Sequence, residues 1–119
     1  MNVTRYLFII LALAFVHAAT ATAQITYTDI LLSPEKYVGT EVTMRGEFSY
    51  NNTERKSFDM KQGDNTIEVF YERLPKEKQA AILTQKNFSK APVAVKGTLR
   101  RFANAENSYY IMAADVLWQ

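Results

Sequence analysis

Cysteine is absent from the 119-residue sequence, and histidine occurs once, as His17. The lack of cysteine excludes a disulfide framework, a thiolate zinc site, a thiol nucleophile and lipid attachment through a cysteine. A charged fraction of 22% and an aromatic fraction of 13% are ordinary for a folded protein, so the composition excludes wholesale disorder. The length supports one domain.

The one long apolar run lies at the amino terminus, from Tyr6 to Val16. A membrane-spanning helix needs about 20 apolar residues, so this run is too short to span comfortably. Its length suits the core of a signal peptide, and Ala19-Thr20-Ala21 or Ala21-Thr22-Ala23 supplies the small-residue cleavage pattern. An uncleaved anchor or a buried core helix is the alternative interpretation. We therefore expect residues 1–23 to be a signal peptide and the protein to be secreted, into a bacterial periplasm.

Cleavage of residues 1–23 would change which catalytic and metal-binding side chains remain more than it would change the size of the protein. It leaves 96 of the 119 residues and removes His17, so the remaining domain has neither histidine nor cysteine. Ser-His or Cys-His catalysis and a zinc site with nitrogen or sulfur ligands are then excluded, and we expect no metal and no cofactor. Arg5 is lost too, so 13 basic residues face 12 acidic ones, which is not the basic excess of a dedicated nucleic-acid-binding protein.

Alternating apolar residues predict five strands in residues 24–119. Short helical turns over Thr28–Tyr37 precede them, and a helix over Lys76–Lys86 follows Pro75. Gly46 inside the first strand predicts a bend or bulge. Of Tyr109 and Tyr110, alternation places one ring in the core and the other outside. The predicted strands are residues 41–50, 56–61, 66–71, 91–100 and 109–118.

This order of elements favours an all-β fold, a five-stranded OB-fold barrel with a helix between strands 3 and 4. Three stretches also resemble small secreted bacterial OB-fold proteins of the tRNA-anticodon-binding-like type: Pro34–Gly46 (PEKYVGTEVTMRG), Val93–Arg100 (VAVKGTLR) and Ala114-Asp115-Val116. The resemblance covers essentially the whole of residues 24–119 and consists of glycines and alternating apolar residues. It implies the barrel, whose relatives bind oligonucleotides and oligosaccharides, and it implies no catalytic residue.

Basic residues flank the predicted second and third strands, which form the ligand-binding face of an OB-fold. Arg55 and Lys56 stand at the start of the second strand, while Arg100 and Arg101 close the fourth strand and open the loop after it. The two pairs are therefore expected to converge around that face. Phe70 projects outward there, and Tyr50 and Phe102 lie near the loops. Aromatic rings bordered by cations suit single-stranded nucleic acid, a sugar or an anionic glycan. The candidate ligand-binding residues are Arg45, Arg55, Lys56, Asp59, Lys61, Glu68, Phe70, Arg100 and Arg101.

Simpler interpretations exist for the same residues. Basic dipeptides at strand ends protect edges and aid solubility, and the aromatic side chains can pack over the barrel ends. Asp59 and Glu68 lie on adjacent strands and project outward, so they form either a glycosidase-type carboxylate pair or part of a solvated, ion-paired face.

We expect a non-enzymatic periplasmic module that binds an oligosaccharide, another anionic ligand or an envelope protein. The alternatives are a single-stranded nucleic-acid-binding protein and a carboxylate-dependent hydrolase.

Overall fold

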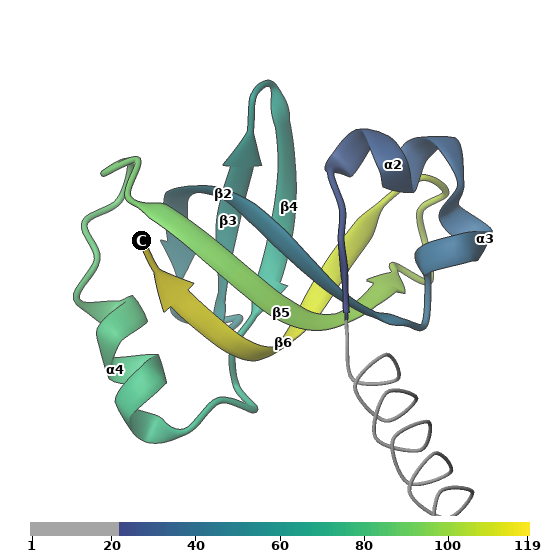
Figure 1. Cartoon of the computed structure of the whole chain (residues 1–119). Coiled ribbons are helices and arrows are strands. Elements are labelled where there is room, and N and C mark those ends of the chain that lie inside the picture. The colour runs from purple at the N-terminus through teal and green to yellow at the C-terminus, as the bar shows by residue number, and fades with distance from the viewer. Residues whose placement is uncertain (1–21) are drawn as a thin grey trace, which may run out of the picture.

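The computed structural model describes residues 22–119, in which one curled sheet forms a closed barrel (Figure 1). The strand order is β1-β2-β3-β4-β6-β5, and a second pairing between β2 and β5 closes the sheet on itself. The strands are β1 (Ala23–Gln24), β2 (Glu41–Asn52), β3 (Ser57–Gln62), β4 (Asn65–Phe70), β5 (Pro92–Arg101) and β6 (Tyr109–Trp118). The five predicted strands are confirmed, and the two-residue β1 is an addition to them.

Three short helices lie at the two ends of the barrel (Figure 1). The first two are α2 (Tyr27–Leu32) and α3 (Pro34–Tyr37), and the third, α4 (Lys76–Leu83), joins β4 to β5. The last turn predicted for the third helix is wrong, because Thr84 ends it. The Thr84 hydroxyl donates to the carbonyl of Ala81 at 2.8 Å, a local bond that competes with helix continuation.

The predicted signal peptide lies outside the described residues except for its last two. Within residues 22–119, no helix combines the length and the apolar character needed to cross a membrane.

Four antiparallel ladders, of which the fourth joins β5 to β6, and one short parallel ladder form the barrel. β2 pairs with β5 over its first half and with β3 over its second half, and β3 and β4 form a hairpin. The parallel ladder joins β4 to β6 through three residue pairs, from Glu68 opposite Tyr110 to Phe70 opposite Met112. This parallel ladder joins segments that lie far apart in the sequence.

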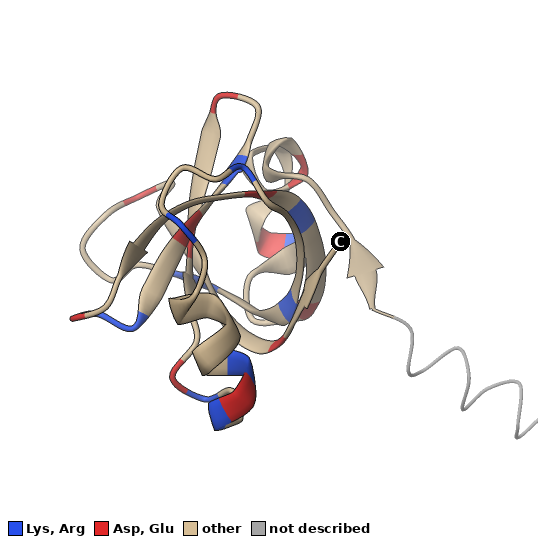
Figure 2. Cartoon of the chain, turned by 90° about the vertical axis from the view of Figure 1, so that its left-hand side faces the viewer, with Lys and Arg blue, Asp and Glu red and all other residues tan. Residues whose placement is uncertain are grey.

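The barrel interior is filled by the apolar residues that alternate along each strand. Figure 2 shows the strands encircling one central space, which these side chains occupy. Of the two tyrosines at the start of β6, Tyr109 is buried and Tyr110 is only partly buried, as alternation predicts. The buried strand residues include Val42, Met44, Phe48, Phe58, Met60, Ile67, Val69, Val93, Val95, Leu99, Ile111 and Val116.

Gly46 lies where β2 passes from its pairing with β5 to its pairing with β3. A Cβ at this position would lie 2.5 Å from the backbone oxygen of Lys61 and 2.7 Å from Cγ of Met60. Glycine therefore allows the two strands to approach each other closely. The irregular register lies further along, between Phe48 and Asn51, so a bulge at Gly46 itself is wrong.

Candidate functional site

The outward faces of β3, β4, β6 and β5 form one continuous surface. Cross-strand pairing places Asp59, Glu68, Tyr110 and Arg100 in one row. Residues two positions away along each strand lie on the same face, so a second row runs beside the first. This second row consists of Ser57, Phe70, Met112 and Thr98.

Three aromatic rings gather on this surface. The ring centroids of Phe70 and Tyr110 are 5.2 Å apart at 77°, and those of Phe102 and Tyr110 are 4.6 Å apart at 45°. Phe102 comes from the loop after β5, and its centroid is 6.5 Å from that of Phe70. We call these three residues and Met112 the aromatic face.

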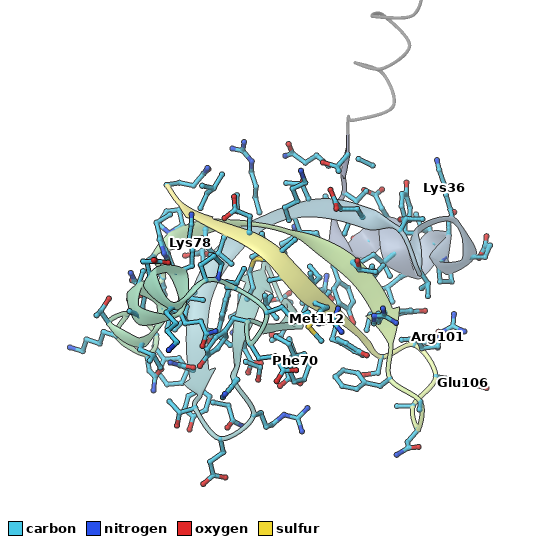
Figure 3. All side chains as sticks on the ribbon, turned by 90° about the horizontal axis from the view of Figure 1, so that it is seen from below. Lys36, Phe70, Lys78, Arg101, Glu106 and Met112 are labelled. Carbon is cyan, nitrogen blue, oxygen red and sulfur yellow. The ribbon has the colours of Figure 1, made fainter. Side chains whose placement is uncertain are left out.

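A hollow of about 300 Å³ opens on the aromatic face. In Figure 3, Phe70 and Met112 lie side by side, with Arg101 at the far end of β5. The lining of this hollow is mostly apolar and includes one carboxylate, that of Glu72, and one guanidinium, that of Arg101. The lining residues are Phe70, Glu72, Arg101, Phe102, Ala103, Tyr110 and Met112.

Arg55 is bound to Glu68 beside the aromatic face. Its Nε lies 2.9 Å from Oε2 of Glu68 and its Nη2 lies 3.0 Å from Oε1, so the contact is bidentate. The guanidinium also lies 5.4 Å from the ring centroid of Phe70. Burial would raise the pKa of Glu68, but hydrogen bonds from Arg55 and Ser57 outweigh it and hold the pKa below its ordinary value.

Asp59 stands opposite Glu68 and has a different environment. Partial burial, with a smaller effect from the neighbouring Glu68 charge, raises the pKa of Asp59 above its ordinary value. Within residues 22–119 no Lys or Arg side chain lies within salt-bridge distance of this carboxylate, so it remains available as an acceptor. The same range contains no group of three or more His, Cys, Asp or Glu residues placed to hold a metal ion.

Six of the nine candidate residues come together around the aromatic face. Phe70, Asp59 and Glu68 lie on it, and Arg55 lies beside it. Arg100 is in the Tyr110 row, and Arg101 lines the hollow.

The other three candidate residues lie elsewhere. Arg45 is paired with Ala94 on another side of the barrel and donates to Oε1 of Gln119 at 3.0 Å. Lys56 is in the turn before β3, with its side chain exposed. Lys61 is at the far end of β3, where it lines a different hollow.

Met112 and Ser57 belong to the site but are absent from the sequence-based set. Met112 reaches Phe70 only through the parallel pairing of β4 with β6, and no local pattern announces a pairing between such distant segments. Ser57 donates to Glu68, and an alternation pattern treats it as an ordinary strand residue. Outward-facing positions of the last strand would have been the signal to follow.

Basic charge is not concentrated on this surface. Figure 2 shows Lys and Arg interspersed with Asp and Glu over the barrel. Arg55 is paired with Glu68, and the Arg101 guanidinium lies 5.6 Å from the ring centroid of Tyr109. The charge of Arg55 is therefore neutralised within the protein, and Arg101 is held against a ring.

No protein-family model matches the sequence, and no curated protein matches it. Solved structures do match the fold. A protein of Leishmania major Friedlin assigned as an aspartyl-tRNA synthetase matches with a TM-score of 0.65 and 14% identity, over 83% of this chain and 21% of that protein. This chain therefore spans about a fifth of that protein's length.

Two shorter proteins match over most of their own length. The hypothetical protein ygiW from E. coli matches with a TM-score of 0.54 and 15% identity, over 85% of this chain and 92% of that one. OBody AM1L10, solved bound to hen egg-white lysozyme, matches with a TM-score of 0.54 and 16% identity, over 71% of this chain and 83% of that one. Identities this low show a common fold and nothing more, and they agree with the predicted OB-fold.

Proposed function

We propose that the protein is a non-enzymatic binding module that holds an oligosaccharide on the aromatic face, in a bacterial periplasm. The observation that carries the proposal is the apolar hollow of about 300 Å³ lined by Phe70, Phe102, Tyr110 and Met112. Sugar rings have apolar faces that pack on aromatic rings, while their hydroxyl groups need hydrogen-bonding partners. Asp59 supplies such a partner in the neighbouring position, whereas Ser57 is buried and donates its hydroxyl to Glu68.

The charges beside the aromatic face favour a sugar over a nucleic acid. A polyanion gains affinity from lysines and arginines that are free to neutralise phosphates. Here Arg55 already neutralises Glu68, and the carboxylates of Asp59 and Glu72 offset the charges of Arg100 and Arg101, so the surface has no basic excess. An uncharged stretch of oligosaccharide needs no such excess.

The test is a titration of the purified protein with oligosaccharides of different linkage, followed by calorimetry and by chemical-shift mapping. We expect binding that shifts resonances of Phe70, Tyr110 and Met112. The F70A variant should bind at least tenfold more weakly, because one wall of the hollow is removed. The matched control is L32A, which removes a side chain that is 76% exposed on α2. Binding that is equal in F70A and wild type, or absent for every oligosaccharide, would overturn the proposal.

Single-stranded nucleic acid is the second candidate ligand. It is favoured by the aromatic rings, by the resemblance noted in the sequence and by the match to a protein assigned as a tRNA synthetase. A salt series with an oligothymidylate distinguishes it, since nucleic-acid affinity falls steeply between 50 and 200 mM salt, by roughly 10³-fold or more for six phosphate contacts. Undetectable binding at low salt removes this candidate.

Hydrolysis by the carboxylates of Asp59 and Glu68 is a further candidate activity. Asp59 and Glu68 form a carboxylate pair in which the pKa of Asp59 is raised and the pKa of Glu68 is lowered. Because Glu68 is held by Arg55, the ion-paired interpretation is favoured over hydrolysis. Turnover of a bound oligosaccharide that is lost in E68Q would contradict this view.

An envelope-protein partner is the remaining candidate ligand. It would appear as a protein that co-purifies with the wild type and not with F70A.

A further inference from the structure

A second hollow, of about 240 Å³, lies between β2, the tip of the β3–β4 hairpin and the segment before β5. It is separate from the aromatic face and uses none of its rings. Its lining combines an exposed aromatic ring, two lysines and hydrogen-bonding groups. The lining residues are Glu47, Phe48, Ser49, Lys61, Gly63, Phe88 and Lys90.

Phe88 is placed beside this hollow in an unusual way. Its side chain is 68% exposed, and its backbone φ of +61° lies in the left-handed region, which a bulky residue rarely adopts. Lys90 has the same φ of +61°. Hydrogen bonds from the Phe88 and Lys90 amides to the carbonyls of Ser49 and Phe48 hold both residues against β2. Strained backbone of this kind persists where surrounding contacts fix it, and it concentrates at functional sites.

A second aromatic side chain extends the exposed surface. Tyr50 is 45% exposed, and its ring centroid lies 6.1 Å from that of Phe88 at 39° between the ring planes. Two exposed rings held close together cost solvation energy unless a ligand covers them. They offer a second place for the apolar face of a sugar ring.

The two lysines give this hollow its chemistry. Lys61 lies opposite Glu47 in the register of β2 and β3, and Lys90 lies across the hollow. Within residues 22–119 neither ammonium group has a carboxylate at salt-bridge distance. Two lysines and one glutamate leave the hollow with a net positive charge, unlike the aromatic face, and this favours an anionic group in the ligand.

The two hollows belong to one continuous surface. Lys61 alternates outward on β3 with Asp59 and Ser57, so one strand face leads from the second hollow to the aromatic face. The four-residue step from Ser57 to Lys61 spans roughly 13 Å along the strand. That length exceeds one sugar ring, so only an oligomer reaches both hollows.

We propose that the hollow of Lys61, Lys90 and Phe88 is a second subsite, which binds an acidic sugar residue of the same oligosaccharide whose other residues lie on the aromatic face. This inference rests on the proposed function and specifies its ligand as an acidic oligosaccharide. The carboxylate of that residue lies between the two lysine ammonium groups, and its ring packs on Phe88.

The experiment compares oligosaccharides of four to six residues, which carry one hexuronic acid at one end and neutral hexoses elsewhere, with the same oligosaccharides after reduction of that carboxylate to a hydroxymethyl group. The reduced oligomers keep the length and linkage and lose the charge. Wild-type protein should bind the acidic form about five- to tenfold more tightly, which corresponds to two partly exposed ion pairs. Chemical shifts of Lys61, Phe88 and Lys90 should move with the acidic form and move less with the reduced form.

Variants then separate the two subsites. The double variant K61Q/K90Q should lose the five- to tenfold preference for the acidic form and bind the reduced form within twofold of wild type. K36Q is the matched control, since Lys36 is an exposed lysine on α3. The double variant K61R/K90R keeps both charges and should retain part of the preference.

Each outcome decides the inference. Equal binding of acidic and reduced oligomers by wild type, or an unchanged preference in K61Q/K90Q, overturns the second subsite while the aromatic face is judged by F70A alone. Failure of both oligomers to bind also overturns it, and the wider oligosaccharide titration then decides the proposed function. Tighter binding of an oligothymidylate than of any oligosaccharide, with a steep salt dependence, would assign the lysines to phosphate groups and overturn both.

Discussion

Asp59 and Glu68 stand directly opposite each other on β3 and β4, yet the pKa of Asp59 is raised and that of Glu68 is lowered. The difference arises from their partners. Glu68 receives hydrogen bonds from Arg55 and Ser57, whereas Asp59 is partly buried beside the Glu68 charge. Two adjacent carboxylates therefore contribute to stability with opposite dependence on pH.

Replacement of Asp59 by asparagine should stabilise the protein at neutral pH. The raised pKa means that the favourable contribution of Asp59 is present below its unfolded-state pKa, near 3.8, and is lost as the pH rises through the folded-state pKa. At pH 7 the charged carboxylate opposes folding, and D59N removes that effect, by up to about 1 kcal/mol. Urea unfolding of both proteins at pH 3 and pH 7 measures it. A D59N protein that is no more stable at pH 7 than wild type contradicts the assignment.

Replacement of Glu68 by glutamine should have the opposite effect. Its lowered pKa means that the stabilising contribution is present above the unfolded-state pKa and is lost as the pH falls through the folded-state pKa. E68Q should therefore show a lower urea midpoint than wild type at pH 7, and the two midpoints should converge below pH 4. D59N is the control on the facing strand. A midpoint difference that persists unchanged at low pH would show that packing, and not charge, is lost.

Gly46 should not tolerate a side chain. The added Cβ of G46A would meet backbone of Lys61 and the side chain of Met60, so we expect a loss of about 1–3 kcal/mol in the free energy of unfolding. G63A is the matched control, because Gly63 has a φ of +58° but open space around it. That variant should lose about 1 kcal/mol from backbone strain alone. Equal losses in the two variants would mean that the close approach at Gly46 has no energetic weight.

Trimming of the amino terminus should be tolerated up to Ile25. The exposed residues Ala23 and Gln24 pair with the edge of β2, whereas Ile25 is 4% exposed and donates its amide to Thr43 at 2.9 Å. The free energy of unfolding of a chain that begins at Gln24 should lie within about 0.5 kcal/mol of that of a chain that begins at Thr22. A chain that begins at Thr26 loses a buried side chain and should be less stable by about 1.5–3 kcal/mol. Either predicted cleavage point is therefore compatible with the fold. A clearly lower urea midpoint for the Gln24 chain than for the Thr22 chain would contradict this.

Alternation along the chain is sufficient to predict the barrel and its order of elements. Val42, Met44, Phe58 and Met60 lie inside as their spacing indicates, because a half-buried strand imposes a period of two. The end of α4 is less predictable, since Thr84 ends it through a bond to the backbone that helix propensity does not include. The two-residue β1 has no periodicity of its own and exists only because β2 offers an edge.

The candidate site is predictable in part for the same reason. Asp59 and Glu68 are neighbours in a hairpin, so local register places them together. Arg45 has the same alternation as other outward residues, but the curvature of β2 carries it to another side of the barrel, beside Gln119. Met112 and Phe88 depend on contacts between distant segments, which the pattern within one segment does not contain.

The parallel ladder between β4 and β6 has a kinetic consequence. It joins residues such as Glu68 and Tyr110 across a long stretch of chain through three residue pairs. Because closing a long loop costs more entropy than closing a short one, we expect this ladder to form after the local β3–β4 hairpin. The aromatic face lies astride this ladder and is complete only in the finished barrel. If these contacts form after the transition state, a ligand bound there will slow unfolding and leave the folding rate nearly unchanged, which stopped-flow folding and unfolding with and without ligand would measure.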